Sequence, residues 1–184
     1  MALKTLLISS TRWLLAALVM GMVISPVAEA ETLPLFGVRL AMADAEFANL
    51  SSSTTAGYGV ILGVTLPKYR VYADLNFYSW DGADTRSIHA NYDYIWRAGE
   101  SWQVFTGIYG GLVDLELDAA DKYQSGPSAG VQAGFLLPLG SSGWQLETGK
   151  RYGGFDAKLL NPATQQEVKI KTQVEGFISL NFSS

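Results

Sequence analysis

His89 is the one histidine of the chain, and it lies two residues after Ser87. A hydroxyl beside an imidazole makes a nucleophile and its general base when a carboxylate orients the ring. Asp74, Asp93 and Glu175 are the carboxylates that are candidates for this role. The alternative is a buried histidine that is hydrogen-bonded within a polar network. We favour this alternative, because no second histidine and no cysteine supports catalysis.

Metal chemistry has few ligands available in this chain. Without cysteine and with one histidine, a zinc or copper site would depend almost wholly on carboxylates. Asp114, Glu116 and Asp118 alternate as in a calcium loop, but the turn glycine and the bidentate glutamate are missing. With Asp121 they form either a solvated loop or a surface that attracts divalent ions. We predict no catalytic, cofactor-binding or metal-binding residue, and no cofactor.

The segments that carry these groups follow the period of β-strands. Large apolar residues fall at every second position, with polar residues or glycine between them. The 19 glycines and the 12% aromatic content also favour strands. Eight segments alternate in this way, the seventh least regularly: 36–42, 58–66, 69–77, 88–96, 102–108, 129–137, 144–152 and 170–182.

The face opposite the apolar one carries charges of both signs. Its members are Arg39, Arg70, Asp74, His89, Asp93, Arg97, Glu147, Arg151, Lys171 and Glu175. A buried charge is tolerable only when it is paired and hydrogen-bonded, so this balanced mixture suits the narrow lumen of a barrel. A soluble barrel or sandwich also alternates, but it would turn its apolar face inward.

Connections between the segments alternate in length. Short turns are expected at 67–68, 98–100 and 138–143, and longer polar loops at 48–53, 81–85, 115–127 and 157–167. This is the pattern of an outer-membrane barrel, in which the short turns face the periplasm. Eight segments leave roughly 19 residues for each strand and its connection, which is enough for a tilted spanning strand.

Aromatic residues gather near both ends of the segments. One set lies near the short turns: Phe36, Tyr69, Trp96, Trp102, Trp144 and Phe182. The other lies toward the longer loops: Phe47, Tyr78, Trp80, Tyr109 and Phe155. We expect these sets to form two girdles at the membrane interfaces. The fold class predicted is all-β, an eight-stranded antiparallel transmembrane up-and-down barrel.

Residues 1–30 read as a cleaved signal peptide. Lys4 and Arg12 form a basic start, an apolar run covers 14–24, and Ala28 and Ala30 form the cleavage site. The run is too short for a spanning helix, although an uncleaved anchor is the alternative. The mature domain is expected to be 31–184. The formal net charge of -4 gives no basis for binding nucleic acid.

In these features the chain resembles the small eight-stranded outer-membrane barrels of Gram-negative bacteria, the group of OmpX, the opacity proteins and the OmpA transmembrane domain. The resemblance covers residues 33–182 and rests on architecture. It implies a location in the cell outer membrane, contact with outer-membrane lipids and lipopolysaccharide, and a monomer. It also implies recognition by the barrel-assembly machinery, for which Leu180-Asn181-Phe182 looks like the signal, although Ser183 and Ser184 follow.

Three functions are considered for such a barrel. The first is a structural or surface-interaction role with a polar, side-chain-filled lumen. The second is a narrow pore for small solutes, which a filled lumen disfavours. The third is a lipid A-modifying enzyme. Similarity to the lipid A deacylase would require a His-x-Ser pair late in the chain, whereas here Ser87 precedes His89 in mid-chain. We therefore expect a protein that is not an enzyme.

Overall fold

The computed structural model describes residues 32–48, 52–99, 101–117, 122–156, 158–160 and 167–183. The predicted signal peptide, residues 1–30, lies outside the described residues. The strands are β1 (Leu33–Ala48), β2 (Ser53–Thr65), β3 (Tyr69–Trp80), β4 (Ala83–Arg97), β5 (Gln103–Leu117), β6 (Lys122–Pro138), β7 (Trp144–Phe155), β8 (Lys158–Leu160) and β9 (Glu167–Ser183). In this part of the chain no helix is long and apolar enough to cross a membrane.

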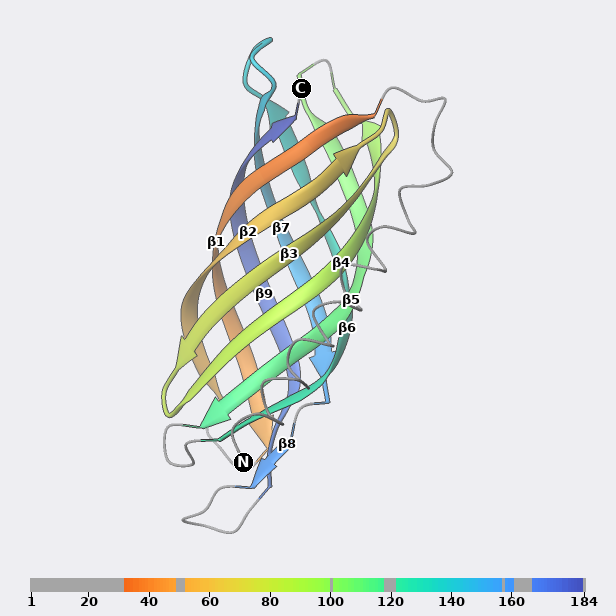
Figure 1. Ribbon diagram of the computed structural model, residues 1–184. Helices are drawn as coiled ribbons and strands as arrows, with labels where there is room; N and C mark the ends of the chain where they lie inside the picture. The colour runs from red at the N-terminus through yellow and green to blue at the C-terminus, as the bar shows by residue number, and fades with distance from the viewer. Residues whose placement is uncertain are drawn as a thin grey trace. The chain divides into compact units, whose positions relative to one another are not determined.

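Eight of these strands form a closed antiparallel barrel. Each long strand pairs with the next along the chain, and β9 pairs with both β7 and β1. Figure 1 shows the strands running steeply inclined around the barrel, with short β8 beside one end of β9. The prediction of an eight-stranded up-and-down barrel is confirmed. Closure pairs the edges of β1 and β9, which an open sheet would leave exposed.

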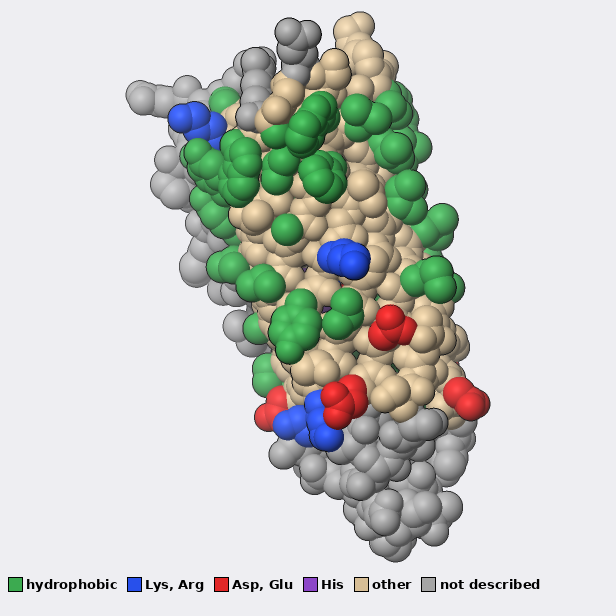
Figure 2. Space-filling view, turned by 180° about the vertical axis from the view of Figure 1, so that it is seen from behind, with side chains coloured by type: hydrophobic (Ala, Val, Ile, Leu, Met, Phe, Trp, Pro, Cys, Tyr) green, Lys and Arg blue, Asp and Glu red, His purple; other side chains and the backbone are tan. Residues whose placement is uncertain are grey.

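Alternation along each strand separates two faces. On β1, for example, Val38 and Leu40 are 59% and 65% exposed, whereas Arg39 between them is 1% exposed. Figure 2 shows the outcome on one side of the molecule, where hydrophobic side chains are spread over the wall and most charged ones gather toward one end. The barrel is therefore apolar outside and polar inside, the reverse of a soluble barrel.

Two of the predicted longer loops are largely strand. β3 and β4 are joined by Asp81 and Gly82 alone, and Gly82 has a φ of 82°. Asp-Gly is a favoured sequence for a two-residue hairpin turn, so pairing continues through 83–85. In the same way β5 and β6 stay paired up to Leu117 and Lys122. These hairpins extend the sheet at one end of the barrel, opposite the end at which β9 finishes with Ser183.

The predicted inward position of Lys171 is wrong. Glu46 on β1 pairs with Thr172, but the next residue pairs with Ile170, so Lys171 is an extra residue in β9. Such a bulge shifts the alternation by one residue. Ile170 is consequently buried inside the barrel, and Lys171 lies outside and forms an ion pair with Glu46 at 3.0 Å.

The expected girdle at the longer loops is also wrong. Tyr78, Trp80, Tyr109 and Phe155 are all buried inside the barrel, and the side chain of Phe47 lies outside the described part. Their positions along the strands have inward parity, which their distance from the strand ends does not reveal. At the other end Phe36, Trp96, Trp102 and Trp144 face outward as predicted and are all at least 41% exposed, while Tyr69 and Phe182 are half-buried.

Candidate functional site

The barrel interior holds a layer of buried charged groups, and we treat it as the candidate functional site. Arg39 comes from β1, Arg70 and Asp74 from β3, and Glu147 and Arg151 from β7. Each is at most 2% exposed. Asp93 on β4 and Glu175 on β9 are buried with them. These seven were predicted to point inward, whereas the side chain of Arg97 lies outside the described residues.

Arg70 and Glu147 form the first centre of the layer. The two terminal nitrogens of Arg70 donate to the two oxygens of Glu147, both at 2.8 Å. Nε of Arg70 donates to Asp93 at 2.7 Å, and Asn181 donates to Glu147 at 2.6 Å. Such paired, charge-assisted bonds fix both position and orientation of the groups.

Asp74 forms the second centre and accepts bonds from three other strands, β1, β4 and β7, as well as from its own. Arg39 donates to Oδ2 at 3.1 Å, and Arg151 and Asn91 donate to the same oxygen. Asn76 donates to Oδ1 at 2.7 Å. Gln132 connects the two centres, because it donates to Asp93 at 2.6 Å and accepts from Arg151 at 2.7 Å.

Aromatic rings lie against the guanidinium groups of this layer. Arg39 lies over Phe177 at 4.2 Å from the ring centre, and Arg70 over Phe105 at 4.6 Å. The rings supply cation–π attraction where water is excluded. Apolar layers lie on both sides of the charges: Trp80, Ala83 and Leu115 at one end of the strands, and Leu35, Ile61 and Leu136 toward the other. Side chains thus fill the lumen rather than lining an open path.

His89 connects to Asp74 but not to Ser87. Its Nδ1 lies 3.1 Å from Oδ1 of Asp74, and its Nε2 lies 2.8 Å from Oγ of Ser128 on β6. This Asp–His–Ser line has the order of a hydrolase triad. All three residues are buried, however, and Asp74 is also bound to Arg39 and Arg151. The geometry therefore makes His89 a bridge between β3 and β6 within the network.

Ser128 is the member of this line that sequence reasoning missed. It is far from His89 in the chain, and only the register of the closed barrel brings the two together. Parity along β6 gives Ser128 an inward position, but parity does not name its partner across the lumen. For metals, the described residues include no group of three or more candidate ligands, and Asp118 and Asp121 lie outside them.

Comparison with known proteins finds this architecture among solved structures. No protein-family model and no curated protein sequence matches the chain. Among solved structures, Neisserial surface protein A is 18% identical with a TM-score of 0.68, covering 81% of this chain and 96% of that one. Outer membrane protein H of P. aeruginosa is 21% identical with a TM-score of 0.56, covering 81% and 99%. OprG of Pseudomonas aeruginosa is 13% identical with a TM-score of 0.50, covering 84% and 96%.

The chain has the fold of the small outer-membrane β-barrels. This agrees with the resemblance inferred from the sequence pattern. At these levels of identity the similarity shows the fold alone, so the residues of this chain must carry any argument about function.

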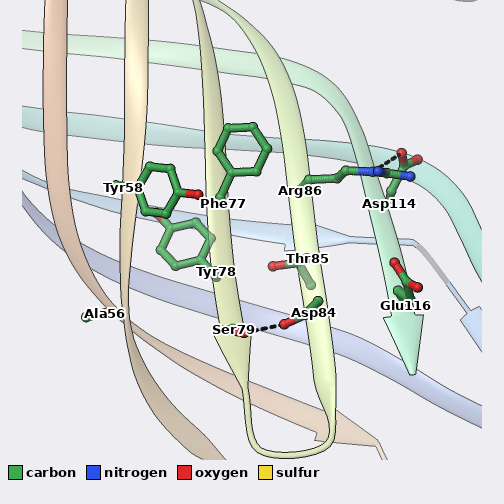
Figure 3. A pocket seen from close by; sticks show the side chains of 10 residues that line it. All are labelled: Ala56, Tyr58, Phe77, Tyr78, Ser79, Asp84, Thr85, Arg86, Asp114 and Glu116. Atoms are coloured by element: carbon green, nitrogen blue, oxygen red, sulfur yellow. Dashed lines mark hydrogen bonds and ion pairs between the residues drawn. The ribbon is translucent and has the colours of Figure 1, made fainter. Parts of the chain in front are cut away.

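The outer wall of this barrel also has a groove. It has a volume of about 340 Å³ and is formed by β2, β3, β4 and β5 near the hairpin ends. Figure 3 shows the aromatic rings of Tyr58 and Phe77 on one side of it and the ion pair of Arg86 and Asp114 on the other. The groove therefore combines apolar and charged groups.

Proposed function

We propose that the chain is a small outer-membrane β-barrel protein with a structural or surface-interaction role, exported with residues 1–30 as its signal peptide. The observation that carries the proposal is the opposition of the two faces. An apolar outer wall suits a bilayer, and a closed charge network suits a stable, filled lumen. Its location is the outer membrane, and the mature chain begins at Glu31.

The proposed partners are the lipids around the barrel. Beyond the apolar wall, two exposed ion pairs lie at the hairpin end: Lys171 with Glu46 and Lys169 with Asp156, each at 3.0 Å. Exposed pairs contribute little stability, so their lysines can exchange carboxylates for lipid phosphates, lipopolysaccharide included. We further propose a monomer that binds no nucleic acid and is inserted by the barrel-assembly machinery.

Absence of enzymatic activity is also part of the proposal. It is supported by the burial of Ser128, since a nucleophile must reach its substrate, and by the other bonds that occupy Asp74. A small-solute pore is disfavoured by the same packing, because Arg70, Glu147 and Asp93 close the cross-section with direct bonds.

Expression of the full chain in a Gram-negative host tests the proposal. The protein should fractionate with outer membranes, and its intact mass should lack residues 1–30. Purified protein in planar bilayers should give no stepwise conductance, while a Arg70→Ala/Glu147→Ala variant serves as the opened-lumen comparison. Recovery in the soluble periplasm, or steady conductance by the unmodified protein, would contradict the proposal.

A further inference from the structure

The outer groove is built from one row of residues that crosses four strands. Tyr58 on β2 pairs with Phe77 on β3, Phe77 with Arg86 on β4, and Arg86 with Asp114 on β5. The two rings stack with their centres 5.3 Å apart. Nε of Arg86 donates to Asp114 at 3.0 Å. The row therefore changes from aromatic to ionic over the width of the groove.

The rows of outward residues on either side of this one show a second change, which runs along the strands. Toward the strand middles the outward residues are Val60, Leu75, Ile88 and Leu112. Toward the hairpin ends they are Ser79, Asp84 and Glu116. An outward face that turns from apolar to charged within three rows marks the boundary between hydrocarbon and headgroups. The groove lies across that boundary.

The carboxylates of the groove differ in the number of hydrogen bonds that they accept. Asp114 accepts bonds from both Arg86 and Ser125, and Asp84 accepts one from Ser79. Glu116 makes no hydrogen bond or ion pair within the described part of the chain. Among the described residues that line the groove, one guanidinium and three carboxylates give a formal charge of -2. This excess favours a ligand that brings a cation.

We propose that the groove binds a membrane lipid whose headgroup carries a primary ammonium next to a phosphate, of the phosphoethanolamine type. The ammonium lies between Glu116 and Asp84, where it can donate to both carboxylates. The phosphate lies against Arg86, whose side chain is 51% exposed despite its ion pair. The acyl chains extend over Tyr58 and Phe77 toward the apolar row nearer the strand middles.

Lipids with other headgroups fit the groove less well. An anionic headgroup without an ammonium would add a negative charge beside Glu116 and Asp84 with no positive charge to compensate it. A choline headgroup keeps the positive charge, but its methyl groups cannot donate hydrogen bonds to those carboxylates. This specificity goes beyond a general structural role, although it rests on the proposed position of the barrel in a membrane.

Native mass spectrometry of the purified, folded barrel tests the proposal with three lipids of equal chain length. Phosphatidylethanolamine should be retained at least about fivefold more than phosphatidylcholine or phosphatidylglycerol, a difference of about 1 kcal/mol. Asp84→Asn/Glu116→Gln should remove this preference. Glu46→Gln, an exposed acid on β1 away from the groove, is the matched control and should keep it.

Phe77→Ala separates the two halves of the site, since it should lower retention of all three lipids equally. Equal retention of the lipids by the unmodified barrel, a preference for phosphatidylglycerol, or equal effects of Glu46→Gln and Asp84→Asn/Glu116→Gln would overturn the proposal. Failure of the proposed function would appear elsewhere, as recovery of the protein in a soluble fraction. The measurement on the purified barrel is independent of that result.

Discussion

Arg70, inside the barrel near the start of β3, and Lys150, on the outer wall in the middle of β7, are both cations, but only Arg70 has carboxylate partners. Arg70 is bound to Glu147 and Asp93. Lys150 is exposed on β7 between Ala133 and Gly176 of the neighbouring strands, with no hydrogen bond or ion pair among the described residues. Charge is thus compensated where water is excluded by protein and uncompensated where lipid is expected.

The difference shows what each surface requires. Removing water from a charge costs several kcal/mol unless a partner replaces it, and the lumen supplies that partner from another strand. On the wall, a lysine can only extend its ammonium along the surface toward the interface. The lumen network is therefore expected to stabilise the fold as a unit, and Lys150 to reduce its stability.

The largest effect is expected for the lumen. Glu147→Met should destabilise the barrel by about 3–5 kcal/mol, because it leaves Arg70 with a single carboxylate. Arg70→Met should cost a similar amount. The double variant should cost clearly less than the sum of the two, as measured by urea unfolding in lipid vesicles.

The exposed pair of Lys171 and Glu46 is the matched control for this cycle. Both side chains are 53% exposed, so each replacement by methionine should cost less than about 1 kcal/mol. Additive losses for Arg70 and Glu147, like those expected at the control pair, would show that the lumen charges act independently.

Lys150→Met should act in the opposite direction. A lysine on the lipid face costs about 2–4 kcal/mol at the bilayer midplane, so its removal should stabilise the barrel by about 2 kcal/mol in the same vesicles. Lys171→Met, near the hairpin end, provides the comparison and should change stability little. A loss of stability on replacing Lys150 would mean that it has an anionic partner in the membrane.

Sequence alternation predicted the barrel, the inward charges and the turn-side aromatic girdle, because each depends on parity along a strand. It even marked the seventh segment as the least regular, and Lys150 on β7 is one reason. Parity fails wherever the ladder gains a residue, which is why Ile170 and Lys171 were exchanged between the faces.

Register is the second thing that the pattern does not contain. Ser128 and His89 lie on β6 and β4, and they meet only because closure of the barrel brings their strands around one lumen. The same is true of Arg70 and Glu147, both of which were predicted to point inward without an assigned partner. A sequence pattern thus gives the membership of the network, and the closed sheet gives its bonds.

Two glycines show how the space available to a side chain differs between the lumen and the wall. A Cβ at Gly107 would overlap Oδ1 of Asp93, whereas one at Gly176 would meet nothing within 4 Å. Gly107→Ala should therefore cost about 1–3 kcal/mol by displacing Asp93 from its bonds. Gly176→Ala should be neutral or stabilising by less than about 1 kcal/mol. Equal unfolding midpoints for the two variants would show that the interior is loosely packed.

The smallest effect concerns His89, the residue that carries the enzymatic alternative. His89→Ala removes the bonds to Asp74 and Ser128, and it should cost on the order of 1 kcal/mol of stability. Asp74 keeps Arg39 and Arg151, so the network should survive this loss.

The acyl pattern of lipid A separates the structural from the catalytic interpretation. Four samples are compared, from cells that express the unmodified protein, His89→Ala, Ser128→Ala or no barrel. Mass spectrometry should give the same acyl pattern in all four samples, because the hydroxyl of Ser128 is buried behind its own network. A chain added or removed by the unmodified protein alone would make the Asp74–His89–Ser128 line catalytic. The lumen would then have to open to a lipid, and the double variant of Arg70 and Glu147 should change that activity as well as stability.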